Sequence, residues 1–178
     1  MPKLDLKNHI RTVPDFPETG IMYRDITTLL SHPAALKQSI EELAEVYRNS
    51  NVDVVAGIDA RGFIFGTAVA LELGVGFVPI RKKGKLPFKT YEQDYQLEYG
   101  TDTLQIHADA VTKGQRVLLI DDLIATGGTA EAAIKLLRRT DCEIAGAAFV
   151  IDLPDLGGAK HIESLGVPVT SLITFSGH

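Results

Sequence analysis

The chain has 178 residues, of which 45% are hydrophobic and 23% charged, and its formal net charge at pH 7 is −5. This length and composition predict one globular domain and exclude disordered and collagen-like chains. The acidic balance argues against a nucleic-acid or membrane-surface partner, which would require a basic surface. With one cysteine, no signal-peptide pattern and no apolar run of membrane-spanning length, we expect a cytoplasmic protein.

Apolar runs and amphipathic segments alternate along most of the chain. We expect one or two helical turns within residues 4–12, and a loop at 14–20, because two prolines and a glycine interrupt either period. Apolar residues at helical spacing predict a helix over 33–49. The remaining segments are predicted as strands at 52–59, 75–80, 116–122, within 142–153 and at 167–173, and as helices at 61–74, 129–139 and 158–165.

Apolar strands that alternate with helices indicate an α/β fold with a parallel, doubly wound sheet. Such sheets bind ligands at the carboxyl ends of their strands. The segments DARG (59–62), RKKGK (81–85) and DDLIATGGT (121–129) each follow a predicted strand, so we expect them to meet at one edge. Residues 89–107 alternate β-forming residues around Gly100, which predicts an inserted two-stranded antiparallel flap.

The segment VLLIDDLIATGGT (117–129) carries the strongest functional signal. A glycine-rich loop that opens a helix presents backbone N–H groups and the positive helix end to a phosphate. The adjacent carboxylates of Asp121 and Asp122 would repel that phosphate, so they are better suited to sugar hydroxyls or to a water-bridged metal ion. Together they indicate a phosphorylated ribose. The structural alternative is a capped turn with two solvated acids, which the full pattern disfavours.

This segment resembles the phosphoribosyl pyrophosphate signature of type I phosphoribosyltransferases. The segments FPETGIMYRDIT, AGIDARGFIFG, IRKKGKLP and QLEYG are similar, in order and spacing, to the adenine branch of that family. The resemblance implies the type I fold in one domain over residues 1–178, with an N-terminal base-binding hood at about 1–30 and the flap at about 82–107. It also implies purine salvage: the 5-phosphoribosyl group passes from the pyrophosphate donor to adenine, giving AMP and pyrophosphate, with Mg²⁺ carried by the donor.

The resemblance also assigns roles to residues on the phosphate and ribose side. Asp121 and Asp122 would bind the ribose hydroxyls and stabilise a cationic sugar. The 5-phosphate would lie on the loop formed by Ala125, Thr126, Gly127, Gly128 and Thr129. The pyrophosphate loop would consist of Asp59, Ala60 and Arg61, with a cis peptide between the first two residues.

Four cations lie within residues 81–85: Arg81, Lys82, Lys83 and Lys85. Such a run is commonly a solvated loop, but beside a polyphosphate site it favours ligand binding by Arg81, Lys82 and Lys85. In the resembling family this segment lies at a subunit interface, where a basic residue reaches the neighbouring pyrophosphate site. The resemblance therefore implies a homodimer.

The base would be bound by the hood and by the end of the 116–122 strand. The resemblance implies that Tyr23 and Leu123 contact the faces of adenine. It further implies that the Met22 carbonyl accepts from the 6-amino group and that the Arg24 N–H donates to N1. Glu98, in the flap, would exchange a proton with the purine nitrogen.

Two other functions remain as alternatives. One is a salvage transferase for another purine base, although the hypoxanthine–guanine branch usually carries Glu-Asp where this chain has Asp121 and Asp122. The other is a non-catalytic regulator that senses phosphoribosyl pyrophosphate. Regulators that bind DNA carry an added helix-turn-helix domain, for which the chain has no room. We therefore expect neither a nucleic acid nor a membrane as partner.

Overall fold

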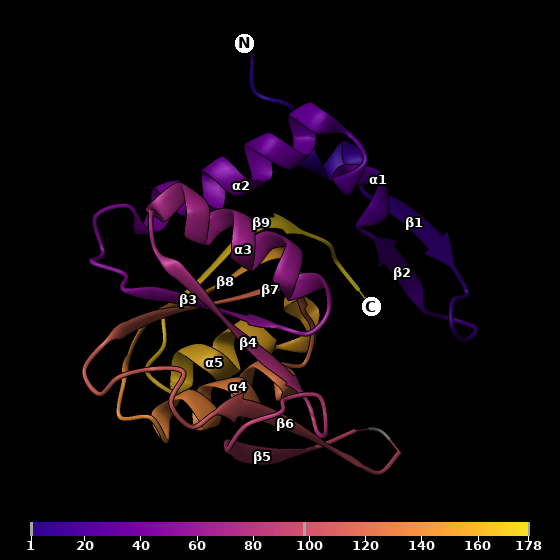
Figure 1. The fold of residues 1–178 in the computed structure, drawn as a ribbon. Coiled ribbons are helices and arrows are strands. Elements are labelled where there is room, and N and C mark those ends of the chain that lie inside the picture. Colours follow the sequence, from indigo (N-terminus) through magenta and orange to yellow (C-terminus); the bar gives the residue numbers. More distant parts are fainter. Residues whose placement is uncertain (1, 98, 178) are drawn as a thin grey trace.

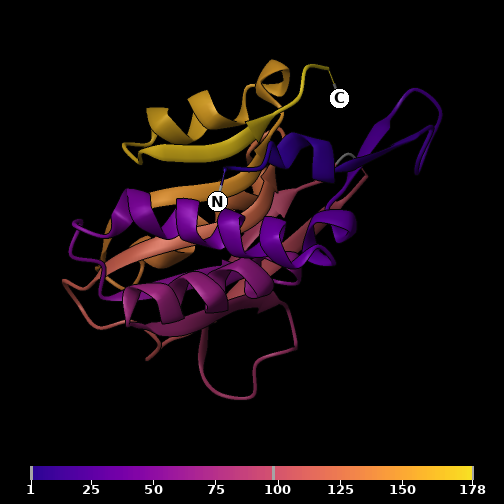
Figure 2. The same cartoon turned by 90° about the horizontal axis from the view of Figure 1, so that it is seen from above.

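The computed structural model describes residues 2–97 and 99–177, which form a central sheet covered by helices on both faces (Figures 1 and 2). The strand order is β5-β6-β4-β3-β7-β8-β9. Five neighbouring strands run parallel: β4 (Gly76–Lys82), β3 (Val54–Ile58), β7 (Arg116–Ile124), β8 (Glu143–Asp152) and β9 (Val169–Thr174). The predicted α/β class and its parallel strands are confirmed.

The helices divide between the two faces, as Figure 1 shows. One face is covered by α2 (Pro33–Tyr47) and α3 (Arg61–Leu73), the other by α4 (Gly128–Arg138) and α5 (Gly158–Ser164). A short 3-10 turn, η2 (Pro154–Leu156), precedes α5. Each face has its own apolar core, with Phe65 buried on one side and Phe149 on the other. Within the described ranges, no helix is long and apolar enough to cross a bilayer.

The predicted flap is an antiparallel ribbon of β5 (Thr90–Gln96) and β6 (Thr101–His107). Strand β6 also pairs antiparallel with the end of β4, through Arg81 and Lys82. The ribbon therefore extends the edge of the central sheet, a connection that the sequence pattern does not indicate.

The N-terminal segment differs from the expected helical turns. Residues Leu6–His9 form a single 3-10 turn, η1, and the chain then becomes extended in β1 (Arg11–Pro14). That strand pairs with β2 (Met22–Asp25) in a separate two-stranded sheet, followed by the short helix α1 (Thr27–Leu30). The structure thus has one of the one or two turns expected within residues 4–12, because pairing with β2 holds the residues of β1 extended.

Candidate active site

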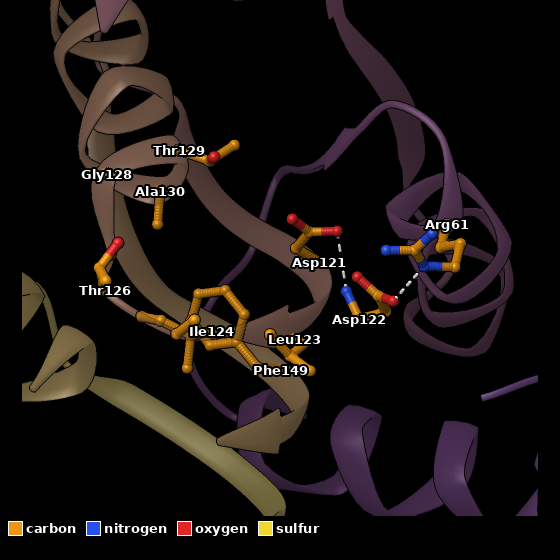
Figure 3. A pocket seen from close by; sticks show the side chains of 12 residues that line it. Arg61, Asp121, Asp122, Leu123, Ile124, Thr126, Gly128, Thr129, Ala130 and Phe149 are labelled. Carbon is orange, nitrogen blue, oxygen red and sulfur yellow. Dashed lines mark hydrogen bonds and ion pairs between the residues drawn. The ribbon is translucent and has the colours of Figure 1, made fainter. Parts of the chain in front are cut away.

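Strand β7 leads into a tight loop, and α4 begins directly after it. A cavity of about 220 Å³ lies at this junction (Figure 3) and is lined by Arg61, Asp121, Asp122, Leu123, Ile124, Ala125, Thr126, Gly127, Gly128, Thr129, Ala130 and Phe149. Gly127 has a φ of +92°, which favours glycine, and it precedes the first turn of α4. The first N–H groups of a helix lack partners within the helix, so this end of α4 can bind an anion.

The loop rests on the start of α5. The Gly158 N–H donates to the Ala125 carbonyl at 3.1 Å. A Cβ atom at Gly158 would lie 2.4 Å from that carbonyl oxygen and 2.9 Å from the Gly127 nitrogen. Gly158, which lies outside the predicted motif, therefore packs directly against the loop.

The two adjacent acids of β7 have different surroundings. Asp122 is only 6% exposed, and its carboxylate accepts a hydrogen bond from the Arg61 guanidinium at the start of α3. Asp121 accepts from the Asp122 N–H at 2.8 Å. Burial and, next, the charge of Asp122 raise the pKa of Asp121 well above its ordinary value. The pair thus combines a carboxylate held by an arginine with a neighbour that keeps its proton more readily.

A second cavity of about 220 Å³ continues from the first toward the ends of β3 and β4. Its lining comprises Ile58, Asp59, Ala60, Arg61, Lys82, Tyr95, Leu104, Asp121, Asp122 and Thr129. Four residues, Arg61, Asp121, Asp122 and Thr129, line both cavities. The peptide between Asp59 and Ala60 is cis, as expected from the resemblance. The predicted meeting of three loops at one sheet edge is therefore confirmed.

Two cations in the wall of this second cavity, Arg61 and Lys82, and one outside it, Arg81, are each bound to a carboxylate of the protein. Arg61 binds Asp122, and Arg81 donates from Nε to Asp59 at 2.9 Å. Lys82 binds Asp102 on β6. The sequence pattern indicated the cations but not these partners.

The hood strand β2 lies beside the two cavities rather than in their walls. Tyr23 packs edge-on against Phe16, with ring centroids 5.2 Å apart. The hydrogen bond to Asp122, and then the charge of that carboxylate, raise the pKa of the neighbouring Arg61 guanidinium above its ordinary value. Figure 1 shows the β1–β2 and β5–β6 ribbons extending on the same side of the molecule.

The half-buried Arg24 side chain contacts two neighbours. Its Nη1 donates to Thr12 Oγ1 at 2.7 Å, and its guanidinium lies 4.2 Å from the centre of the Phe175 ring. The Lys7 ammonium lies 4.7 Å from the centre of the same ring. The C-terminal segment thereby supports the hood, a contact that only the folded chain reveals.

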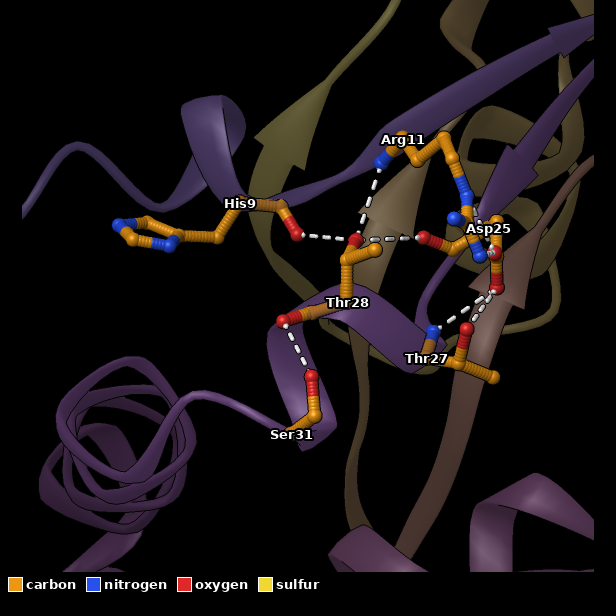
Figure 4. Close-up of polar contacts among 6 residues, drawn as sticks. All are labelled: His9, Arg11, Asp25, Thr27, Thr28 and Ser31. Atoms are coloured by element: carbon orange, nitrogen blue, oxygen red, sulfur yellow. Dashed lines mark hydrogen bonds and ion pairs between the residues drawn. The ribbon is translucent and has the colours of Figure 1, made fainter.

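Asp25, at the end of β2, ties the hood strand to its surroundings (Figure 4). It accepts from the Thr27 N–H at 2.9 Å and from Arg11 Nε at 3.0 Å. The Thr27 and Arg11 hydrogen bonds lower its pKa to about 2. Sequence analysis assigned Asp25 no role, although the RDIT segment that contains it pointed to the family.

Among the described residues, Lys85 is exposed and is absent from the linings of both cavities. Glu98, the predicted proton-exchange residue, lies outside the described residues.

The comparisons with known proteins agree with this geometry. The family model described as "Phosphoribosyl transferase domain" matches residues 25–169, a span that contains both the loop and the acidic pair, so the chain is a phosphoribosyltransferase-family protein. A curated relative from Maricaulis maris, named adenine phosphoribosyltransferase, is 57% identical over 98% of this chain and 99% of its own.

Solved structures give the same result. The adenine phosphoribosyltransferase of Rhodothermus marinus is 52% identical with a TM-score of 0.89, and 96% of each chain is covered. The adenine phosphoribosyltransferase of Saccharomyces cerevisiae, complexed with an imino-altritol bisphosphate and adenine, is 37% identical with a TM-score of 0.88, covering 94% of this chain and 96% of that one. The chain belongs to the adenine phosphoribosyltransferase family.

The Asp25 contacts predict a pH-dependent contribution to stability. Because the folded-state pKa of about 2 lies below the unfolded value of about 3.9, this contribution is present above about pH 4 and is lost as the pH falls through 2. At pH 6, Asp25→Asn should lower the free energy of unfolding by about 1–2 kcal/mol. Urea unfolding of both proteins between pH 6 and pH 2.5 should show the difference shrinking with acid.

Asp109→Asn is the matched control, since Asp109 is an exposed aspartate on a turn. It should change the free energy of unfolding by less than about 0.5 kcal/mol at every pH. A difference for Asp25→Asn that stays constant from pH 6 to pH 2.5 would contradict the proposed stabilising role of the charged carboxylate.

Proposed function

We propose that this protein acts in purine salvage and transfers the 5-phosphoribosyl group from phosphoribosyl pyrophosphate to adenine, giving AMP and pyrophosphate. The observation that carries the proposal is the pair of connected cavities that share Arg61, Asp121, Asp122 and Thr129. One cavity has the features of a phosphate cradle, and the other gathers cations for a diphosphate. The two carboxylates lie between them, where the ribose would be.

The chemistry follows from this order of groups. The N–H groups of the 125–129 loop bind the 5-phosphate, while Asp121 and Asp122 hydrogen-bond to the ribose hydroxyls. The bond from the anomeric carbon to the pyrophosphate oxygen breaks, and a bond to the purine nitrogen forms. Positive charge that develops on the sugar is stabilised by the carboxylates, which are already in place and need little reorganisation. Arg61, Arg81 and Lys82 stabilise the departing pyrophosphate, and Glu98 takes the proton that the purine nitrogen loses.

The carboxylates at the site suit a metal ion that arrives bound to phosphoribosyl pyrophosphate. Among the described residues, no group of three or more metal-binding side chains exists. Mg²⁺ is commonly held by one or two carboxylates together with waters and substrate phosphates. Asp121 and Asp122 would hold it through water, and when bound it would neutralise charge on the diphosphate.

Adenine is recognised in this proposal by backbone groups of β2. Met22 and Arg24 lie two residues apart on β2, so their backbone groups point to the same side of the strand, where the Met22 carbonyl accepts from the 6-amino group. The Arg24 N–H donates to N1, while the contacts of its side chain with Thr12 and Phe175 fix the residue. Leu123 and Tyr23 pack on the base.

The same proposal covers the organisation of the protein. One domain carries residues 1–30 as the hood and 82–107 as the flap, and the protein acts in the cytoplasm. It forms a homodimer, which is supported by exposed apolar side chains on α3, Ile64 at 44% and Leu71 at 76%, and by Phe88 at 59% in the 83–89 segment. Lys85 is then free to reach the site of the other subunit.

Asp122→Asn should fold and lose most of its activity. The substitution removes one preorganised charge beside the developing cation, so we expect kcat to fall roughly 10²–10³-fold. Steady-state kinetics of AMP formation, with the unfolding midpoint measured alongside, test this. Asp109→Asn is the control and should keep wild-type kinetics. A loss of less than tenfold in a folded Asp122→Asn protein would refute the assigned role.

Base selectivity should reside in the backbone. A 6-oxopurine has an oxygen at position 6 and an N–H at N1. Its oxygen would face the Met22 carbonyl, acceptor against acceptor, and its N–H would face the Arg24 N–H, donor against donor. Each unpaired buried group costs about 1–3 kcal/mol. We expect kcat/KM for adenine to exceed that for hypoxanthine by about 10²–10⁴-fold, and Met22→Leu to leave the ratio nearly unchanged. A ratio below about tenfold in the wild type would instead favour a broader purine transferase.

Subunit mixing tests the shared site. Lys85→Ala and the double variant Asp121→Ala/Asp122→Ala should each be inactive alone. If Lys85 acts on the other subunit, a hybrid dimer has one site with both features intact, and activity returns on mixing. Subunit exchange is verified separately with differently tagged chains. Proven exchange without any recovery would mean that Lys85 acts within its own subunit.

A further inference from the structure

The Lys82 ammonium has a partner unlike those of Arg61 and Arg81. Asp122 and Asp59 stand at the ends of the central strands β7 and β3, whereas Asp102 belongs to β6 in the edge ribbon. Lys82 thus links the wall of the pyrophosphate cavity to the flap. The Lys82–Asp102 ion pair has no part in the proposed transfer reaction.

Strand register explains why these groups meet. Lys82 faces Leu104 across the sheet, and Asp102, two residues from Leu104, points to the same face. Tyr95 is the cross-strand partner of Asp102. Its ring is buried, and its hydroxyl accepts from the Lys82 ammonium at 2.5 Å. Two acceptors of the ribbon therefore draw the ammonium toward β5 and β6.

The Lys82 ammonium can exchange its partner Asp102 for an anionic ligand. The side chains of Lys82 and Asp102 are 42% and 33% exposed, and ion pairs with this exposure contribute little net stability. The hydrogen bond from Lys82 lowers the pKa of Asp102, so the carboxylate is charged at neutral pH. A diphosphate in the cavity offers the ammonium several anionic oxygens in place of one carboxylate. Because Lys82 also lines that cavity, a change of its side-chain rotamer is enough.

We propose that Asp102 is a positioning residue for the pyrophosphate site. It holds the Lys82 ammonium in the free protein and gives it up to a pyrophosphate oxygen when ligand binds. The inference rests on the proposed function, which supplies the pyrophosphate. Since Asp102 competes with the ligand for one ammonium, it weakens pyrophosphate binding, by about threefold to fivefold for a pair of this exposure.

Calorimetric titration of inorganic pyrophosphate with Mg²⁺ tests the competition. Asp102→Asn should bind about threefold to fivefold more tightly than wild type. Asp94→Asn is the matched control: Asp94 lies next to Tyr95 on β5, on the opposite face of the ribbon, and accepts from Thr103 at 2.6 Å. It removes the same charge and should leave the affinity unchanged. Equal or weaker binding by Asp102→Asn, or by Asp102→Ala if the first variant fails to fold, overturns the proposal.

A double-mutant cycle separates exchange from simple charge repulsion. In the Lys82→Met background, Asp102→Asn should give no gain in affinity, because no ammonium remains to be released. A gain that persists there overturns the exchange. In the transferase assay, Asp102→Asn should lower KM for the donor without raising kcat.

The same experiments distinguish failure of the proposed transferase function from failure of the proposed exchange at Lys82. A wild-type protein that neither binds pyrophosphate nor forms AMP would refute the proposed function. A wild type that does both, with a pyrophosphate affinity that Asp102→Asn leaves unchanged, would refute the exchange alone.

Discussion

The ion pair between Arg61 and Asp122 is the contact on which the site depends. It joins the first turn of α3 to the carboxyl end of β7 and compensates a carboxylate that is 6% exposed. Without the arginine, that buried charge would lack a partner, at a cost of several kcal/mol. The approach of α3 is close, since a Cβ atom at Gly62 would lie 2.9 Å from the Ile120 carbonyl oxygen. The loop formed by residues 59–61 and the acidic pair are therefore held against each other.

Much of the fold follows from local sequence patterns. The helix predicted over 61–74 is Arg61–Leu73, and Gly74 ends it in the left-handed conformation at φ +73°. The buried parallel strands can also be recognised in the sequence. Because both of their faces are covered, they appear as mostly apolar runs. The hood strands and the junction of β6 with β4 were not predicted. Each depends on pairing between segments distant in sequence, and β2 is only four residues long.

For the site, the sequence indicated which loops meet but not how their charges pair. Arg61 was expected to face an anion, and in the structure Asp122 is its partner. Lys82 binds Asp102, twenty residues further along, because the register of β4 against β6 brings them together. The roles of Asp25 and Phe175 in holding the hood likewise arise from tertiary contacts. A motif predicts the chemistry of a loop, whereas the partner of each charge is set by the fold.

The flap joins the sheet beside the second cavity. Strands β5 and β6 pair with each other over seven residue pairs, but β6 pairs with β4 over only two. Those two pairs begin at Arg81 and Lys82, the residues whose side chains bind Asp59 and Asp102. The ribbon therefore meets the sheet at two residues whose side chains carry positive charge. Of the two ion pairs, only Lys82–Asp102 reaches the ribbon, because Arg81–Asp59 joins β4 to the end of β3. A ligand that takes the Lys82 ammonium would therefore remove one side-chain contact between β4 and the ribbon.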